Sequence, residues 1–251
     1  MLNPKISIIT ASYNVKKSIE ETIQSVIIQT YNNIEYIVID GCSTDGTLEI
    51  INKFKNNISK IISENDNGIY DALNKGIKYA SGDVIGFLHA DDIFADNTIV
   101  EKIAAKFEME NVSVIYGDLQ YVSKKDTSKI IRYWKSGVFN FSNLKKGWMP
   151  PHPTFYALKS IYTSIGTFNT SYKIAADYDL MMRIISKNKI NPEYISEVLV
   201  KMRIGGQSNK SIRNILTKMR EDLNIIKSNK IGGFMTLLYK NFSKIPQLFL
   251  K

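Results

Sequence analysis

The first 92 residues repeat one pattern, in which a short apolar run ends in polar residues and is followed by an amphipathic segment. Four apolar runs have the length and composition of buried strands: residues 6–11, 36–39, 58–62 and 84–88. Segments with helical spacing of apolar residues separate them, at about 17–27, 48–54 and 69–80. This alternation predicts a Rossmann-like, doubly wound α/β fold with a mostly parallel sheet and helices on both faces.

Each predicted strand ends in polar or acidic residues, namely Ser12, Tyr13 and Asn14, then Asp40, then Asp66, and finally Asp91 and Asp92. In an open α/β sheet the carboxyl ends of the strands line the crevice where ligands bind. Paired carboxylates at such a place need water or a divalent cation. The sequence therefore predicts a cation beside a phosphate group at this edge of the sheet.

The composition is that of an ordinary globular protein of one large domain, with 251 residues and a net charge of +9. The positive charge favours anionic partners, such as nucleotides, nucleic acid or an anionic membrane, unless the lysines serve only solubility. The single cysteine, Cys42, excludes an intrachain disulfide and indicates a reducing compartment. The absence of a signal-like segment and of a spanning apolar run predicts a cytoplasmic protein.

Several enzyme classes lack their motifs in this chain. No Gly-x-Gly-x-x-Gly follows the first strand, which disfavours a Rossmann dehydrogenase. Gly41 and Gly46 have the spacing of a P-loop, but Thr47 stands where the lysine belongs. Two histidines and one cysteine argue against a zinc site, and no Gly-x-Ser-x-Gly elbow is present.

The second half predicts a helix near 97–107, a strand at 112–116, a hairpin of 119–122 with 130–134, and a last strand at 194–202. Residues 135–160 are irregular and predict a loop that walls a pocket rather than core. Ser81-Gly82 predicts a left-handed C-cap for the helix before it. Asp177 begins a predicted helix, where an acid serves either as a cap or in chemistry.

Residues 209–251 predict a basic amphipathic helical tail. Apolar residues follow helical spacing along one face, and lysines and arginines occupy the other. Such a segment suits the surface of an anionic membrane. Packing against the domain, or against a second subunit in a homo-oligomer, is the alternative.

Several motifs together resemble the family 2 inverting glycosyltransferases with the GT-A fold. They are SIITASYN at 7–14, IDGCSTDGT at 39–47, GIKYASGDVIGFLHADD at 76–92, IYGD at 115–118, His152, ADYD at 176–179 with Arg183, and Gly205-Gly206-x-Ser208. Each motif is weak alone, but their order and spacing are specific, and the resemblance covers about residues 5–208.

The resemblance implies a nucleotide-diphosphate sugar as donor and Mn²⁺ or Mg²⁺ as cofactor. It implies that Asp177 is the catalytic base and that Asp91, helped by Asp92, holds the metal and the diphosphate. The other residues of the donor site would be Ser12, Tyr13, Asn14, Asp40, Asp66, Asp71, Lys75 and Ala90, with Ser12 and Tyr13 against the base and Asp40 on the base or ribose. His152, Asp179 and Arg183 would lie on the acceptor side.

The resemblance divides the chain into a nucleotide-sugar-binding half at 1–95, an acceptor-binding half at 96–208, and the tail at 209–251. The expected reaction adds a sugar to a hydroxyl of a glycan or lipid-linked glycan in cell-surface polysaccharide synthesis. The expected place is the cytoplasmic face of the membrane, with peripheral contact through the tail. Nucleic acid is not an expected partner, because carboxylates at every strand end repel a polyanion.

The chain departs from the family pattern at four positions. His89 replaces the first acid of Asp-x-Asp, Gly41 replaces a second acid, Leu73 stands at a frequent arginine, and Ala176 replaces a glutamate. These departures concern recognition of the donor more than the class of reaction. Two alternatives stay open: a nucleotidyltransferase of similar fold, although its Gly-rich basic loop is missing, and a non-catalytic module that binds a nucleotide sugar or RNA.

Overall fold

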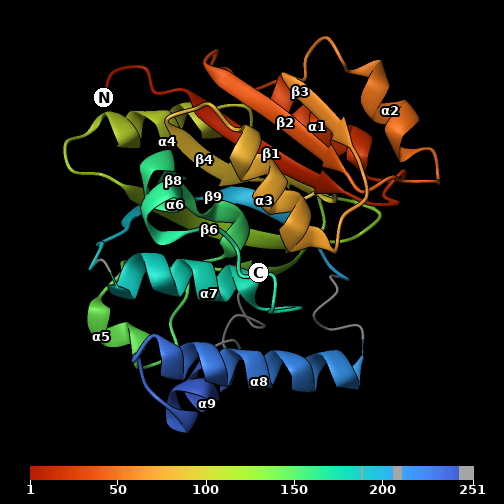
Figure 1. Ribbon diagram of the computed structural model, residues 1–251. Helices are drawn as coiled ribbons and strands as arrows, with labels where there is room; N and C mark the ends of the chain where they lie inside the picture. The colour runs from red at the N-terminus through yellow and green to blue at the C-terminus, as the bar shows by residue number, and fades with distance from the viewer. Residues whose placement is uncertain (188, 206–210, 243–251) are drawn as a thin grey trace.

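The computed structural model describes residues 1–187, 189–205 and 211–242. Its described strands form a nine-stranded sheet with the order β3-β2-β1-β4-β8-β6-β9-β5, and β7 pairs with β6 (Figure 1). Helices cover both faces of this sheet, so the predicted α/β class is confirmed. In the described ranges, no helix has the length and apolar character needed to cross a membrane.

The first four strands are mutually parallel, as the alternating pattern predicts. They are β1 (Ile6–Ser12), β2 (Ile34–Asp40), β3 (Lys60–Ser63) and β4 (Val84–Phe87). The helices between them are α1 (Ile19–Ile27), α2 (Thr47–Lys53) and α3 (Ile69–Tyr79). Because the four strands run in one direction, their carboxyl ends lie at one edge of the sheet.

Parallel and antiparallel strands complete the sheet. The second half contains β5 (Asp92–Phe94), α4 (Ile99–Glu108), β6 (Val114–Val122), β7 (Ile130–Trp134), α5 (Phe141–Leu144), a 3-10 turn (His152–Thr154), β8 (Tyr156–Leu158), α6 (Lys159–Ile165), α7 (Ala176–Met182) with a π-helical extension (Arg183–Lys187), and β9 (Glu193–Arg203). β8 is antiparallel to both β4 and β6, whereas β9 runs parallel to β6. The hairpin of β6 with β7 confirms the prediction.

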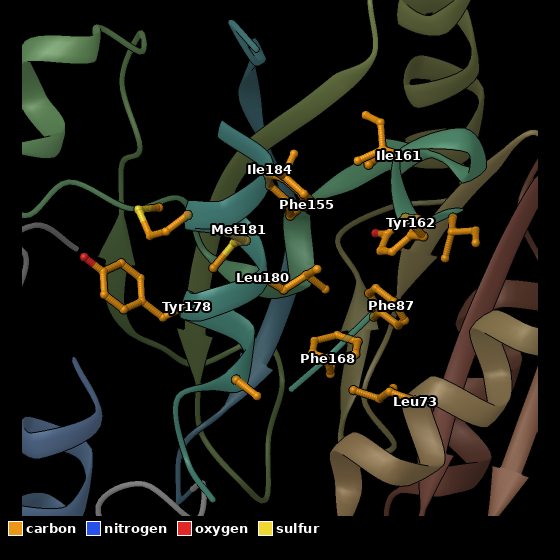
Figure 2. Packing of buried hydrophobic residues seen from close by; sticks show 14 of the residues in the cluster. Leu73, Phe87, Phe155, Ile161, Tyr162, Phe168, Tyr178, Leu180, Met181 and Ile184 are labelled. Atoms are coloured by element: carbon orange, nitrogen blue, oxygen red, sulfur yellow. The ribbon is translucent and has the colours of Figure 1, made fainter. Parts of the chain in front are cut away.

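The sheet separates two apolar cores. One contains the inner faces of α1 and α4, and the other contains those of α3, α6 and α7. In the second core, Phe87 of β4 meets Phe168 at 5.2 Å and Tyr162 at 6.2 Å between ring centroids, both edge to face (Figure 2). Such aromatic pairs contribute roughly 0.5–1.5 kcal/mol beyond their burial. This packing joins α6 and the loop before α7 to the parallel half of the sheet.

The prediction of a loop without core over 135–160 is wrong, and already in the first half Phe139 and Leu144 are buried in a core. Phe155, Tyr156 and Ala157 are buried, and β8 lies between β4 and β6. The ring of Tyr156 occupies the space that a side chain at Gly86 would fill. A three-residue strand beside three prolines is too short to show a period, so the pattern missed it.

Two other local predictions also differ from the structure. Gly82 has no left-handed conformation, and α3 ends through the extended residue Ala80. Gly82 is instead packed so tightly on the first strand that a Cβ atom would lie 2.6 Å from the carbonyl oxygen of Lys5. Residues 114–122 form one continuous strand whose register shifts at Gly117 and Asp118, where the sequence predicted a break.

The described part of the tail packs on the domain. It forms α8 (Ile212–Ser228) and α9 (Phe234–Phe242), which lie beneath α7 in Figure 1. Buried Asp222 of α8 accepts from Lys218 at 2.6 Å and from Lys240 of α9 at 2.7 Å. Of the alternatives for residues 209–251, packing against the domain therefore holds for 211–242, and the remaining residues lie outside the described ranges.

Candidate active site

Asp40 connects the carboxyl ends of the first three strands. It is fully buried at the end of β2 and accepts from Ser12 at 3.2 Å, from Ser63 at 2.8 Å, and from the amide and hydroxyl of Ser43 at 3.0 and 2.5 Å. These bonds use both carboxylate oxygens inside the protein. They hold the loop after β2 against the edge of the sheet, and a contact of Asp40 with base or ribose stays a prediction.

An exposed aromatic ring and a carboxylate flank Gly41. The side chain of Tyr13 is 64% exposed, and Asp66 accepts from the amide of Gly68 at 2.8 Å. A Cβ atom at Gly41 would overlap Oδ2 of Asp66 and lie 3.3 Å from the ring of Tyr13. The missing acid at position 41 thus leaves room for the carboxylate of Asp66. The left-handed residue Asn14 accepts from the amide of Thr44 at 2.9 Å and joins the two loops.

Lys75 faces the acidic loop after β3. Its ammonium group donates to the carbonyl of Asn65 at 2.6 Å and pairs with Glu64 at 3.0 Å and with Asp71 at 3.8 Å. Asp71 also accepts from the amide of Asn67 at 3.0 Å and closes the first turn of α3. A contact of Lys75 or Asp71 with the donor therefore stays a prediction.

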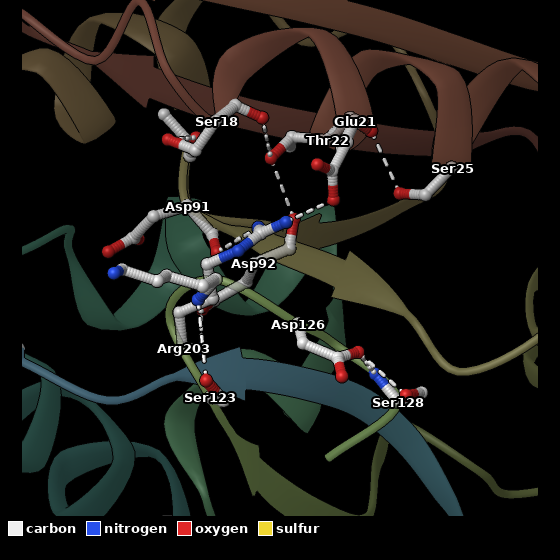
Figure 3. Close-up of polar contacts among 12 residues, drawn as sticks. Ser18, Glu21, Thr22, Ser25, Asp91, Asp92, Ser123, Asp126, Ser128 and Arg203 are labelled. Atoms are coloured by element: carbon white, nitrogen blue, oxygen red, sulfur yellow. Dashed lines mark hydrogen bonds and ion pairs between the residues drawn. The ribbon is translucent and has the colours of Figure 1, made fainter.

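The two neighbouring acids after β4 have different surroundings (Figure 3). Asp92 is buried, and its Oδ1 accepts from the amide of Arg203 at 3.3 Å. The guanidinium of Arg203 donates to the carbonyl of Asp91 at 2.7 Å and pairs with Glu21. Burial raises the pKa of Asp91, and burial together with the charge of Asp91 raises that of Asp92. Asp91 stays partly exposed, and its role as a metal ligand stays a prediction.

Ala90 contributes to the site through its backbone. Its side chain is buried, and its carbonyl accepts from the hydroxyl of Ser18 at 3.0 Å. Ser18 precedes α1, so this bond fixes the turn after β4 against the start of that helix.

Asp177 lies in the first turn of α7 and does not cap the helix. The N-cap is Ala175, which makes no side-chain capping bond. Oδ2 of Asp177 lies 3.3 Å from Nδ1 of His152, and Oδ1 lies 3.4 Å from the hydroxyl of Tyr70. That hydroxyl donates to the carbonyl of Ile174 at 2.6 Å. Asp177 thus faces groups from α3 and from the turn before β8.

Two histidines extend this contact to the turn after β4. Nε2 of His152 lies 3.0 Å from Nε2 of His89. With Asp177 ionised, Nδ1 of His152 carries the shared proton, so its Nε2 accepts from His89. Desolvation lowers the pKa of His89 to about 3. It also lowers the pKa of His152, although the negative charges of Asp177 and Asp91 act to raise that pKa. Both rings are therefore neutral at pH 7.

Asp179 and Arg183 make contacts inside the protein. Arg183 donates to Asp179 at 2.8 Å and to the carbonyls of Ile165 and Thr167 at 3.0 and 2.7 Å. These bonds join α7 to the turn after α6. A role of either residue on the acceptor side stays a prediction.

The acids present fit a metal that arrives with a phosphate ligand. Within the part of the chain that the structure describes, no group of three or more His, Cys, Asp or Glu side chains could hold a metal ion. Mg²⁺ is often bound by one or two carboxylates together with the phosphates of a substrate. The partly exposed carboxylate of Asp91 suits that mode, whereas Asp92 is buried against Arg203.

A model of glycosyl transferase family 2 matches residues 7–174. The chain is a family 2 glycosyltransferase. Membership confirms the expected family and the expectation of an enzyme that transfers a sugar from a nucleotide-sugar donor. It does not support the nucleotidyltransferase or the non-catalytic module that the sequence left open.

Curated relatives of this glycosyltransferase include two bacterial enzymes. The "PGL/p-HBAD biosynthesis glycosyltransferase" of Mycobacterium bovis is 30% identical over 83% of this chain and 81% of its own length. The "UDP-Glc:alpha-D-GlcNAc-diphosphoundecaprenol beta-1,3-glucosyltransferase WfaP" of Escherichia coli is 35% identical over 72% of this chain and 70% of its own length.

Solved structures share the fold of this glycosyltransferase. The alignment with TarS 1–349 of S. aureus, in complex with UDP-GlcNAc, covers 95% of this chain and 73% of that chain, with a TM-score of 0.71 and 20% identity. The alignment with the mannosyltransferase PcManGT of Pyrobaculum calidifontis, in complex with GDP-Man and Mn²⁺, covers 99% of this chain and 76% of that chain, with a TM-score of 0.67 and 14% identity. These likenesses confirm the GT-A fold.

Sequence reasoning missed three residues that shape the site. Tyr70 contacts Ile174 and Asp177 at the start of α7, Arg203 holds the turn after β4, and Glu221 accepts from the loop before α7. A charged residue at the end of a buried strand was a signal for Arg203. Nothing local marks Tyr70 or Glu221, because each acts on a segment distant in sequence.

Proposed function

We propose that this glycosyltransferase moves a sugar, with inversion, from a nucleotide-diphosphate donor to a hydroxyl of a lipid-linked or polymeric glycan. One observation carries the proposal: His152 connects Asp177 to His89, the residue two positions before Asp91. The two histidine rings thus connect the carboxylate proposed for the acceptor, Asp177, to the turn that carries the carboxylate proposed for the diphosphate, Asp91. The relatives that act in glycolipid synthesis and on a diphosphoundecaprenol-linked sugar support the acceptor class.

The donor would bind along the edge formed by the first three strands. Tyr13 offers an exposed ring for stacking against the base, and Asp66 offers a carboxylate next to Gly41 for its polar edge. Ser12, Asn14 and Asp40 hold the loops that shape this surface. The UDP-sugar complex of the structural neighbour supports this class of donor.

Mn²⁺ or Mg²⁺ would be held by Asp91 together with the diphosphate of the donor. When bound, the ion neutralises the charge that develops on the departing diphosphate. Arg203 fixes the backbone of Asp91, so the carboxylate stays at the sheet edge. The complex of the structural neighbour with Mn²⁺ supports this cofactor.

Asp177 would act as the general base. Its carboxylate takes the proton of the acceptor hydroxyl while the hydroxyl oxygen attacks the anomeric carbon. The bond from that carbon to the diphosphate breaks on the opposite face, and its electron pair leaves with the diphosphate. A base in this position contributes about 10²–10⁴-fold in rate. Nδ1 of His152 lies against the same carboxylate and restrains its orientation.

A thermal-shift screen of UDP-glucose, UDP-GlcNAc and GDP-mannose, each with and without Mn²⁺, tests the donor site. We expect one donor to raise the melting temperature, and the increase to require Mn²⁺ and to disappear in Asp91→Asn. The control is Asp96→Asn, because Asp96 lies on the surface near α4. Absence of any stabilisation, or stabilisation that persists in Asp91→Asn, would contradict the proposal.

We further propose that the enzyme works at the cytoplasmic face of an anionic membrane. A cavity of about 630 Å³ between α5, the extension of α7 and the end of α8 supports this contact. Its lining includes four lysines and no acid: Lys145, Lys187, Lys189 and Lys230. The chain continues from Lys230 into α9, where Phe234, Met235, Tyr239 and Phe242 are more than half exposed. Lysines beside exposed aromatic residues suit anionic lipid headgroups.

Sedimentation with vesicles tests the membrane contact. We expect binding to phosphatidylglycerol vesicles but not to phosphatidylcholine vesicles. Lys187→Glu/Lys230→Glu should weaken binding at least about tenfold, because each lysine near an anionic surface contributes about 1 kcal/mol. Lys53→Glu/Lys55→Glu, on and after α2, is the control with the same change of charge. Equal loss in both variants would leave only a nonspecific effect of net charge and would overturn the assigned surface.

A further inference from the structure

The loop before α7 is held by a carboxylate from the C-terminal helix pair, α8 and α9. Glu221 of α8 is buried, and Oε1 accepts from the amide of Lys173 at 2.8 Å. Oε2 accepts from the amides of Ile174 and Ala175 at 3.0 and 2.9 Å. The three donors are consecutive and end at Ala175, two residues before Asp177. One side chain therefore binds the whole segment from which α7 begins.

The carboxylate of Glu221 lies next to the start of α7, a helix that has no side-chain cap of its own. Ala175, the N-cap, has no side chain that could accept a hydrogen bond, and none caps the helix. Amides at a helix start need acceptors, and a negative charge there also interacts favourably with the helix dipole. Glu221 accepts from the amide of the N-cap residue, Ala175, and so brings an acceptor and a negative charge next to the helix start from 46 residues further along the chain.

The segment is also held from the opposite side. The hydroxyl of Tyr70 donates to the carbonyl of Ile174 at 2.6 Å, while the amide of Ile174 donates to Glu221. The peptide units before Asp177 are thus fixed between α3 and α8. Rotation of this segment would move the carboxylate of Asp177 away from His152.

The helix pair makes a second contact with α7, immediately after Asp177. Nζ of Lys240 lies 3.1 Å from the ring centroid of Tyr178 and donates to Asp222 at 2.7 Å. Lys240 and Asp222 are both buried. The start of α7 is therefore packed on charged groups of α8 and α9 on both sides of the base.

We propose that Glu221 is a positioning residue for Asp177, and that the C-terminal helix pair is part of the catalytic apparatus. The family model ends at residue 174, so this residue lies beyond the matched segment. The inference rests on the proposed role of Asp177 as base. Glu221 touches neither substrate nor reacting atoms, and it acts on the rate through the geometry of the loop.

Hydrogen exchange tests the contact without any ligand. In Glu221→Gln one carboxylate oxygen becomes an amide group, which cannot accept from a backbone amide. We expect exchange at residues 173–175 to accelerate about tenfold or more, and further in Glu221→Ala. The control is Ile103→Ala, which removes a fully buried apolar side chain of α4, in the other core of the protein. Unchanged exchange in both Glu221 variants would overturn the proposal.

Kinetics with the donor found in the screen test the consequence. We expect Glu221→Gln to lower kcat about 10- to 100-fold and to leave the KM for the donor within about twofold, because a small displacement of a catalytic group has this effect. Ile103→Ala, compared at equal folded fraction, should keep kcat. Faster exchange with unchanged kcat would overturn the positioning role. Full transfer by Asp177→Asn would instead overturn the proposed function, and the exchange result would still stand.

Discussion

Nδ1 of His152 lies 3.3 Å from Oδ2 of Asp177, although the two residues come from an irregular segment and from the start of a helix. The same imidazole meets His89 through its other nitrogen at 3.0 Å. His152 therefore joins the acid proposed as base to the turn that carries the acid proposed for the metal. Each of the following predictions concerns one link of this arrangement.

Replacement of His152 should affect turnover more than donor binding. His152→Ala removes the imidazole that lies against Asp177 and lets the carboxylate rotate, so we expect kcat to fall about 10- to 100-fold. His152→Asn, whose amide still donates near the position of Nδ1, should recover part of this loss. Steady-state kinetics with the donor of the screen measure the effect. Equal loss in both variants, or a loss confined to donor KM, would show that His152 does not orient Asp177.

A side chain at Gly41 should displace Asp66. The added Cβ atom of Gly41→Ala would overlap Oδ2 of Asp66, and overpacking of this kind costs about 1–3 kcal/mol. We expect weaker donor binding and a lower free energy of unfolding. Asp66→Ala should weaken donor binding alone, and the double variant should regain stability relative to Gly41→Ala. Calorimetry measures donor binding, and urea denaturation measures the free energy of unfolding, for the wild type, the two single variants and the double variant. Additive effects of the two substitutions would show that a side chain at position 41 does not displace Asp66.

The stability of the protein should fall in mild acid because of His89. Desolvation lowers its pKa from 6.5 to about 3, so below pH 6.5 the unfolded chain takes up a proton that the folded chain excludes. The contribution is complete above pH 6.5 and is lost progressively as the pH falls toward 3. The raised pKa of Asp92 acts in the opposite sense and weakens the folded state as the pH rises.

A comparison with His89→Asn separates the two effects. The variant keeps Asp92 but has no titrating group at position 89, so its free energy of unfolding should fall less than that of the wild type between about pH 7 and pH 5. Urea denaturation at several pH values measures this difference. Parallel curves for the two proteins would mean that His89 is not held neutral in the folded state.

Much of the fold was predictable because the first 92 residues are locally consistent. Apolar runs, amphipathic helices and polar strand ends all agree there, and the parallel order of β1 to β4 follows from them. The second half carries less local information. β8 has three residues, and its place depends on the fit of Tyr156 over Gly86, which no periodicity reveals.

The site shows the same division. The motifs indicated Asp40, Asp91 and Asp177, and the structure places Asp40 at the end of β2, Asp91 between β4 and β5, and Asp177 in α7 against His152. The residues that hold the surrounding loops could not be predicted from the sequence. Glu221, for example, accepts from the amides of residues 173–175, which are 46 to 48 positions away. For the tail the sequence left two possibilities, an anionic membrane surface or packing against the domain or a second subunit, and its amphipathic pattern predicts charges that face solvent. Asp222 and Lys240 are instead buried against each other.

Donor binding and transfer, measured side by side in Asp177→Asn and Asp91→Asn, test the central claim most directly. Calorimetry with Mn²⁺ and the donor of the screen should give wild-type affinity for Asp177→Asn and greatly reduced affinity for Asp91→Asn. Transfer by Asp177→Asn should fall about 10²–10⁴-fold. Loss of donor affinity in Asp177→Asn, or transfer at the wild-type rate, would contradict the separation of roles between the two carboxylates.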